Sequence, residues 1–258
     1  MAYELIKVEE KHGGAVTEII LSSHPGNVLE LAMMREIATQ MKIDEQNPHK
    51  KLIVFSAEGK HFSFGASVEE HTADKIGEML PNFHTFIGDI IKCPIPTLAK
   101  VSGLCLGGAF EFVLACTFIC ADESAKFGLP EIVLGVFPPP ACVLLPERAG
   151  DALAAQMILT GDQFPASKFA NDGFLTMLVE KGGLGDAVDK YFEKQFLSKS
   201  ASSIRFAHKA SRLNLVDLYE KQIGKAQRLY IDELMKTSDA NEGIGAFLEK
   251  RSPVWKDA

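Results

Sequence analysis

Two glutamates, Glu111 and Glu131, lie alone in the most apolar stretch of this 258-residue chain. Glu111 follows the glycine pair at 107–108, and Glu131 directly follows Pro130. Neither segment offers a nearby lysine or arginine that would obviously neutralise the carboxylate. A carboxylate buried without a partner takes up a proton or costs on the order of several kcal/mol, so we expect at least one of the two to have a raised pKa of roughly 6 to 7.

Either glutamate, taken alone, is more often a structural residue that caps a helix or binds backbone. Two of them in one apolar region, both tied to glycine or proline turns, favour a functional pair. Of two carboxyl groups in such surroundings, one can act as a general acid and the other as a general base.

Composition limits the classes of function. Hydrophobic residues make up 47% of the chain and charged residues 24%, which is ordinary for a globular protein. The net charge of -7 disfavours a broad nucleic-acid-binding surface. No signal peptide and no run of roughly 18 apolar residues is visible, so we expect a cytoplasmic protein without a membrane span. The five cysteines indicate no disulfide framework, and the scattered histidines predict no metal site.

The order of predicted elements indicates a mixed α/β core followed by helices. Strands are expected at 3–9, 15–21, 51–56, 96–101, 119–127 and 174–180, the first two forming a hairpin. Helices are expected at 29–41, from 107 onward, and near 151–159, 166–171, 184–197, 200–212, 215–236 and 240–250. Charged helices dominate after about residue 190, which suggests a core at 1–190 and a helical C-terminal assembly region at 191–258.

Two glycine-containing turns are candidates for binding a negative charge through backbone N–H groups. The pair at 107–108 opens a helix after a strand, so its amides lie at the positive end of the helix dipole. The turn at 62–67 contains Gly65, which allows close backbone approach. The glycine spacing is not G-x-G-x-x-G, and neither a Walker A lysine nor a G-x-S-x-G motif is present, which disfavours dinucleotide binding, P-loop chemistry and serine hydrolysis.

An ordered set of segments resembles the successive signatures of the crotonase, or enoyl-CoA hydratase/isomerase, superfamily. The segments are Phe62-Ser63-Phe64-Gly65-Ala66, Ile95-Pro96-Thr97 to Gly103, Leu106 to Glu111, Phe127 to Glu131, Leu159-Thr160-Gly161 and Phe247 to Arg251. The resemblance covers nearly the whole chain. It implies an α/β spiral core of ββα turns and a helical C-terminal trimerisation region, assembled as a homotrimer or a dimer of trimers.

The resemblance also implies roles for individual residues. The N–H groups of Ala66 and Gly108 would hold the thioester oxygen of an acyl-CoA, and Glu111 and Glu131 would hold and activate water. Phe247 and Lys250 match positions that help bind the coenzyme A nucleotide, often from a neighbouring subunit. The implied reaction is water addition to a conjugated double bond, with no cofactor beyond the coenzyme A carried by the substrate.

Two departures from the common family pattern concern the acyl pocket. Ser67 stands where ordinary enoyl-CoA hydratases carry an aspartate, and the proline-rich stretch at 137–146 replaces a glycine-rich one. Both features are similar to hydratases of cyclic dienoyl-CoA thioesters in anaerobic aromatic degradation, the benzoyl-CoA pathway. Phe62, Phe64 and Phe137 would then line a wide apolar pocket for a flat ring, although core packing is the more common role of such residues.

Three alternatives remain open from the sequence. The same two carboxylates would serve a straight-chain enoyl-CoA hydratase or an enoyl-CoA isomerase. An RNA-binding relative is disfavoured by the acidic net charge and by the lack of an aromatic and basic RNA motif. A non-catalytic assembly protein is disfavoured as well, because it has little reason to keep two costly carboxylates in an apolar region.

Overall fold

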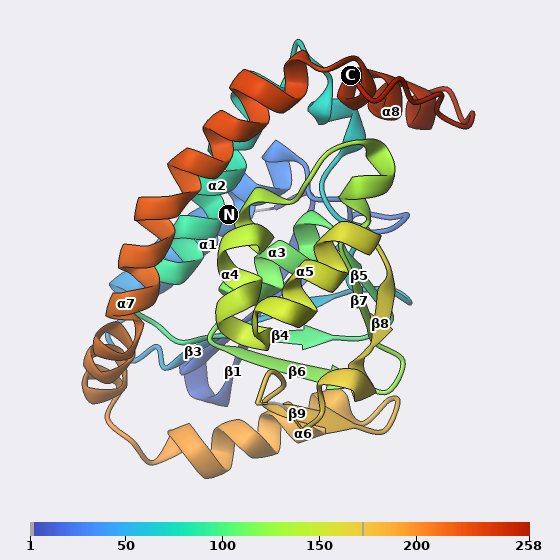
Figure 1. The fold of residues 1–258 in the computed structure, drawn as a ribbon. Helices are drawn as coiled ribbons and strands as arrows, with labels where there is room; N and C mark the ends of the chain where they lie inside the picture. Colours follow the sequence, from blue (N-terminus) through green and yellow to red (C-terminus); the bar gives the residue numbers. More distant parts are fainter. Residues whose placement is uncertain (1–2, 172) are drawn as a thin grey trace.

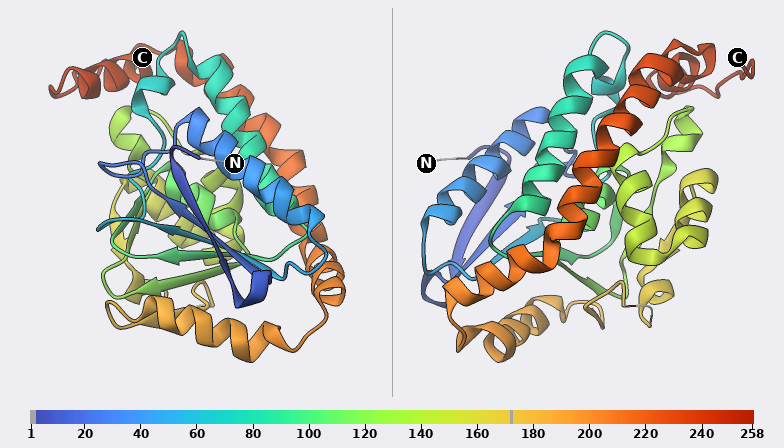
Figure 2. Two further views of the ribbon diagram at one scale, coloured as in Figure 1. Left: turned by 180° about the vertical axis from the view of Figure 1, so that it is seen from behind. Right: turned by 60° about the vertical axis from the view of Figure 1, so that its left-hand side comes forward.

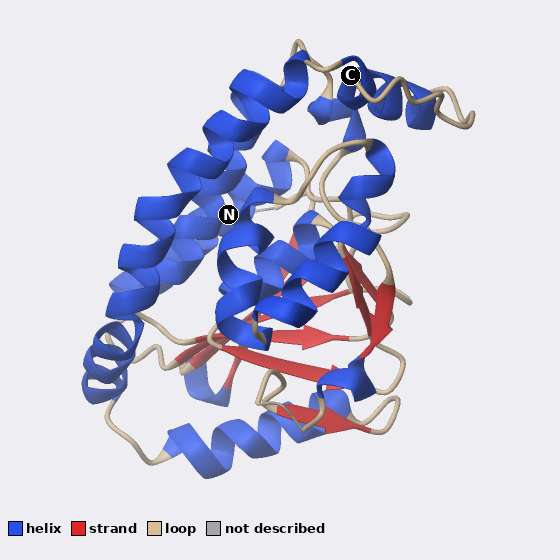
Figure 3. Cartoon of the chain, in the orientation of Figure 1, coloured by secondary structure: helices blue, strands red, loops and turns tan. Residues whose placement is uncertain are grey.

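Two sheets hold the strands of the computed structural model, which describes residues 3–171 and 173–258. The larger sheet has the order β1-β2-β3-β4-β6-β9, and the smaller has the order β5-β7-β8 (Figure 3). The strands are β1 (Ile6–Lys11), β2 (Val16–Leu21), β3 (Leu52–Ala57), β4 (Thr97–Val101), β5 (Leu104–Leu106), β6 (Phe118–Asp122), β7 (Lys126–Gly128), β8 (Gln163–Pro165) and β9 (Met177–Val179).

Helices cover both faces of the larger sheet (Figure 1). The α-helices of the described residues are α1 (Leu31–Gln46), α2 (Ile76–Lys92), α3 (Gly108–Ala115), α4 (Pro139–Ala149), α5 (Asp151–Thr160), α6 (Leu184–Phe192), α7 (Ala201–Arg228) and α8 (Ser238–Leu248). Successive side chains of β3 point to opposite faces of the sheet. Leu52 and Val54 pack in the small cluster with α6, while Ile53 and Phe55 join the main core. The mixed α/β core that the sequence predicts is confirmed.

The first two strands form the predicted hairpin, with Ile6 opposite Leu21 and Lys11 opposite Val16. Its turn contains Gly13 and Gly14, both at positive φ, a backbone conformation that glycine adopts without steric cost. From β2 onward the larger sheet is parallel. The carboxyl ends of β3 and β4 therefore lie at one edge, and the chain leaves β4 there to enter the segments that build the candidate site.

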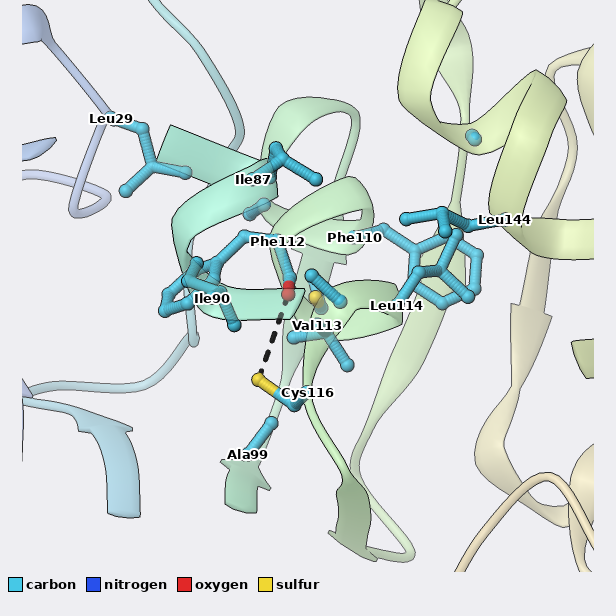
Figure 4. Packing of buried hydrophobic residues seen from close by; sticks show 14 of the residues in the cluster. Leu29, Ile87, Ile90, Ala99, Phe110, Phe112, Val113, Leu114, Cys116 and Leu144 are labelled. Carbon is cyan, nitrogen blue, oxygen red and sulfur yellow. Dashed lines mark hydrogen bonds between the residues drawn. The ribbon is translucent and has the colours of Figure 1, made fainter. Parts of the chain in front are cut away.

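Helix α3 lies at the centre of the molecule, and all eight of its residues are buried. Figure 4 shows Phe112 beside Ile87 and Ile90 of α2, whereas Phe110 and Leu114 face Leu144 of α4. A helix that is apolar on every side needs neighbours on every side. Burial of the whole helix fixes its N-terminus, which carries Gly108 and Glu111, relative to the rest of the fold.

The C-terminal helices pack across the core helices. Helix α7 runs beside α2 and α4, and α8 packs against the short 3₁₀ helix Pro130–Leu134 (Figures 1 and 2). The sequence predicted two helices at 200–212 and 215–236, which is wrong. Asn214 carries only a small helix penalty, so α7 continues to Arg228 and ends in a π-helical turn, Leu229–Glu233.

Other differences from the predicted elements have local causes. The single strand expected at 119–127 is two strands in different sheets, because the Asp122 carboxylate accepts hydrogen bonds from the N–H and hydroxyl of Ser124 and turns the chain. The segment expected to be a helix at 166–171 is a 3₁₀ helix, Ala166–Phe169. Helices α2 and α4 were not predicted, and in the described residues no helix is long and apolar enough to cross a membrane.

Candidate active site

A cavity of about 360 Å³ lies between α3, the 3₁₀ helix Pro130–Leu134 and the C-terminal helices. Four polar side chains reach it, namely His71, Glu111, Glu131 and Tyr230. The other side chains around it are apolar: Phe64, Ala66, Val68, Met79, Leu80, Phe83, Leu106, Pro130, Val133, Leu134, Val136, Phe137, Pro138, Pro139, Ile244 and Phe247. Such a pocket suits an apolar acyl group with a few polar contacts that orient it.

The backbone amides of Ala66 and Gly108 come together at one wall of this cavity. A Cβ placed on Gly108 would lie 3.1 Å from the Ala66 nitrogen, so no side chain fits between the two. Among the hydrogen bonds that the described residues form, neither amide has an acceptor. Gly108 is also the first residue of α3, where N–H groups have no partner within the helix. The pair can accept a developing oxyanion.

Gly107 brings Glu131 close to these amides. Its φ of 51° and ψ of -131° form a backbone conformation that residues with a Cβ rarely adopt. A Cβ at this position would also lie 2.8 Å from the Oε1 atom of Glu131. Glycine is therefore needed both for the turn into α3 and for the approach of the carboxylate. The other oxygen of Glu131, Oε2, is buried and has no hydrogen-bond partner among the described residues.

Glu111 is held by the start of helix α4. Its Oε1 accepts a hydrogen bond of 2.9 Å from the backbone N–H of Ala141. Pro138, Pro139 and Pro140 precede Ala141 and have no N–H groups, so Ala141 supplies the first backbone donor of this helix. The proline run fits the first turn, where proline is well tolerated, and leaves one defined donor for the carboxylate.

Burial raises the pKa of both carboxyl groups. The pKa of Glu131 is raised to about 8 by burial. The pKa of Glu111 is raised well above its ordinary value, first by burial and then by the nearby charge of Glu131, while the Ala141 hydrogen bond acts in the opposite direction. The direction agrees with the sequence-based expectation, although the value for Glu131 is higher. Because two adjacent carboxylates repel, loss of the first proton from the pair makes loss of the second harder, so there is a pH range in which one member is protonated and the other ionised.

The raised pKa of Glu131 predicts that stability falls with rising pH. Between the unfolded value near 4.5 and the folded value near 8, the folded protein binds more protons than the unfolded chain, so the free energy of unfolding decreases as pH rises through this range. We expect Glu131 to contribute a loss of roughly 2 to 4 kcal/mol that is complete a little above pH 8, and Glu111, whose pKa is also raised, to add to the loss. Denaturant unfolding from pH 5 to 8.5 measures it, and Glu131→Gln should flatten the curve. Equal slopes for the two proteins would contradict the prediction.

Two arginines bind the opposite end of α3. Arg148 Nε donates to the Leu114 carbonyl at 2.8 Å, and its Nη2 donates to the Cys116 carbonyl. Arg212 donates to the Ala115 carbonyl at 2.5 Å. Positive groups at a helix C-terminus interact favourably with the negative end of the helix dipole. The opposite, positive end of α3 lies at Gly108, beside the cavity. The sequence interpretation did not single out either arginine.

The structure brings most, but not all, of the predicted site residues together. Ala66, Gly108, Glu111 and Glu131 line one cavity with Phe64, Phe137 and Phe247. Three predicted residues do not line it. Phe62 is 1% exposed and packs in the core near Phe112, Ser67 uses its carbonyl to bind His71, and Lys250 is exposed after α8.

Sequence reasoning missed Ala141 and Tyr230. Ala141 acts through its backbone, and its only signal is its place directly after three prolines. Tyr230 lies about a hundred residues after the two glutamates and belongs to a segment that looked like an ordinary assembly helix. Only the packing of α7 against α2 and α4 brings it to the cavity.

Solved structures place the fold in a known class. The chain matches an enoyl-CoA hydratase from Mycobacterium avium subsp. paratuberculosis K-10 with a TM-score of 0.86 and 22% identity, covering 99% of this chain and 100% of that one. It matches an enoyl-CoA hydratase/isomerase from Xanthobacter autotrophicus Py2 with a TM-score of 0.85 and 26% identity, covering 96% and 94%. The fold is therefore that of the crotonase class, as the sequence resemblance predicted.

The sequence comparisons agree with the fold. A relative from Thauera aromatica, a cyclohexa-1,5-dienecarbonyl-CoA hydratase, is 36% identical over 98% of this chain and 97% of its own length. A probable enoyl-CoA hydratase from Bacillus subtilis is 29% identical over 93% of this chain and 95% of its own length. The profile of the enoyl-CoA hydratase/isomerase family matches residues 11–258, so the chain belongs to that family, and its activity is of the enoyl-CoA hydratase type.

Proposed function

We propose that this protein adds water to cyclohexa-1,5-diene-1-carbonyl-CoA, a cyclic conjugated dienoyl thioester. The observation that carries the chemistry is the convergence of two backbone amides and two buried carboxyl groups on one apolar cavity. The similarity to the Thauera aromatica hydratase supports the cyclic substrate. The aromatic side chains of Phe64, Phe83 and Phe137 give the cavity flat apolar walls that suit a six-membered ring.

The thioester carbonyl would bind between the N–H groups of Ala66 and Gly108. Conjugation carries negative charge onto this oxygen as water adds to the diene, and the two amides stabilise that charge where it develops. The positive end of α3 acts in the same direction. Because the buried helix fixes Gly108, and Ala66 packs closely against it, these donors need little reorganisation during the reaction.

The two glutamates would carry out the proton transfers. The ionised member takes a proton from water as the C–O bond forms, and the protonated member gives a proton to carbon, so that the pair ends with its protons exchanged. The Ala141 hydrogen bond holds the Glu111 carboxyl in place, while Oε2 of Glu131, which has no hydrogen-bond partner among the described residues, can bind water. The pKa of about 8 for Glu131 lies close to neutral pH, where proton transfer in both directions is efficient.

The substrate can be tested directly by comparing two thioesters. We expect rapid hydration of cyclohexa-1,5-diene-1-carbonyl-CoA and kcat/KM at least about tenfold lower for crotonyl-CoA, because a four-carbon chain leaves part of the apolar cavity unfilled. Absorbance of the conjugated thioester gives the rates, and mass spectrometry verifies the addition of one water. Faster hydration of crotonyl-CoA would instead favour a straight-chain hydratase, and a product of unchanged mass with a shifted double bond would favour an isomerase.

Assembly and coenzyme A binding extend the proposal. Exposed apolar side chains on α7, including Phe206 at 72% and Leu213 at 63% exposure, support a homotrimer or a dimer of trimers built with the C-terminal region. Phe247 lines the cavity and is 54% exposed, which suits contact with the coenzyme A portion of the substrate, and Lys250 is close to it in the chain. Coenzyme A enters as part of the substrate, and the proposed chemistry uses no further cofactor.

A further inference from the structure

Tyr230 carries a buried hydroxyl to which the proposed proton transfers assign no role. The residue is 1% exposed and lines the same cavity as Glu111 and Glu131. Among the described residues its hydroxyl has no hydrogen-bond partner. An unsatisfied buried hydroxyl is uncommon because it loses its contacts with water and gains none in return. A bound ligand or water in the cavity would satisfy it.

The position of this hydroxyl is set by packing. Tyr230 belongs to the π-helical turn Leu229–Glu233 that follows α7. Such turns insert an extra residue into a helix and frequently occur at functional sites. The aromatic ring packs edge-on against Phe137, with ring centroids 5.2 Å apart. The hydroxyl is therefore directed by its ring contacts and remains free to bind what enters the cavity.

The electrostatic surroundings make Tyr230 a donor. Burial, followed by the negative charges of Glu131 and Glu111, raises the pKa of the phenol. The phenol therefore stays protonated at neutral pH and in the range in which Glu131 titrates. It provides an O–H donor in a cavity whose other polar side chains are the two carboxyl groups and His71, which binds the Ser67 carbonyl through Nδ1.

We propose that the Tyr230 hydroxyl donates a hydrogen bond to the oxygen atom that the enzyme adds to the substrate. In hydration this atom is the water oxygen, which becomes hydroxide-like as a glutamate removes its proton. In dehydration it is the product hydroxyl, which gains negative charge as the C–O bond breaks. Tyr230 keeps its proton in both directions, so the glutamates still carry out both proton transfers. The inference rests on the proposed function and adds a third side chain to that site.

The test is Tyr230→Phe, which removes the oxygen and keeps the ring that packs on Phe137. For the cyclic dienoyl-CoA we expect kcat to fall at least about tenfold, with KM within about twofold of wild type, because that substrate lacks the hydroxyl. In the reverse direction, with the hydrated product purified from the wild-type reaction, KM should also rise. The ratio of kcat/KM between the two directions stays fixed by the equilibrium constant, which checks the data internally.

Tyr219→Phe is a matched control on α7, which leads directly into the turn that carries Tyr230. Tyr219 is also buried, but its hydroxyl donates to the His84 carbonyl at 2.9 Å. We expect this variant to have a lower Tm with near-wild-type turnover, whereas Tyr230→Phe should have an unchanged or higher Tm with impaired turnover. A merely structural Tyr230 would reverse that pattern.

Failure of this inference is distinguishable from failure of the proposed function. Wild-type kcat in Tyr230→Phe together with inactive glutamate variants would overturn the role of Tyr230 alone. Active glutamate variants would overturn the proposed chemistry itself. Should crotonyl-CoA prove the faster substrate, the same comparison is made with it and with 3-hydroxybutyryl-CoA, where the same kcat and KM pattern is expected.

Discussion

Glu131→Gln is expected to give a folded protein whose hydration rate is at least about a hundredfold lower than that of wild type. Glutamine has nearly the same shape but cannot take up or release a proton at neutral pH. Glu111→Gln should have an effect of similar size, because the two groups act as a pair and each step needs both. The amide oxygen of glutamine can still accept the Ala141 hydrogen bond, so the start of α4 should remain in place.

The measurement is single-substrate kinetics on the cyclic dienoyl-CoA, with circular dichroism and Tm to confirm folding. Both variants should unfold at the wild-type temperature or above it at pH 7.5, because each removes a carboxyl group that is costly to ionise when buried. Glu147→Gln, an exposed position on α4, is the matched control and should behave as wild type. Full activity in both Glu111→Gln and Glu131→Gln would contradict the acid–base assignment.

Gly108→Ala is expected to lower kcat by about a hundredfold through steric blockage of the two amides. The added methyl group would lie 3.0 Å from the Ala66 Cβ, 3.1 Å from the Ala66 nitrogen and 3.2 Å from Phe83. It would therefore stand where the thioester oxygen must approach. Loss of one oxyanion donor typically costs on the order of 3 kcal/mol in the transition state, which corresponds to this fold-change.

The matched control for Gly108→Ala is Gly77→Ala. Gly77 is exposed in the first turn of α2, and a Cβ added there meets no heavy atom within 4 Å. Both substitutions improve helix propensity, so a difference between them reports the cavity and not the helix. We expect Gly77→Ala to keep wild-type kcat and KM. A Gly108→Ala enzyme with wild-type kcat would show that the thioester oxygen binds elsewhere.

The part of the site that could be predicted from sequence is the part carried by local motifs. Gly108 and Glu111 share one helix turn, and Glu131 follows its proline, so their types and spacing are visible without a structure. Phe62 shows the limit of such reasoning. Residues 62 and 64 look equivalent in the sequence, but their side chains differ in direction, and one enters the core while the other lines the cavity.

The parts of the fold that were missed depend on tertiary contacts. Helix α2 contains Pro81, and α4 begins with a proline run, so both segments look unfavourable for helices when read locally. Packing against α3 and α7 stabilises them all the same. The division of 119–127 into two strands depends on the small turn at Asp122 and Ser124. The hydrogen bonds of this turn end the first strand, although the apolar residues around it favour a continuous strand.

The position of Tyr230, Ile244 and Phe247 in the cavity wall has a consequence for synthesis of the chain. Both glutamates and both amides come from residues 66–131, but the wall is completed by residues that leave the ribosome about a hundred residues later. Until then, a partly folded nascent chain has an open apolar cavity around two carboxyl groups. Exposed apolar surface of this kind promotes aggregation and attracts chaperones. The enzyme therefore gains a closed site only as α8 folds onto the core.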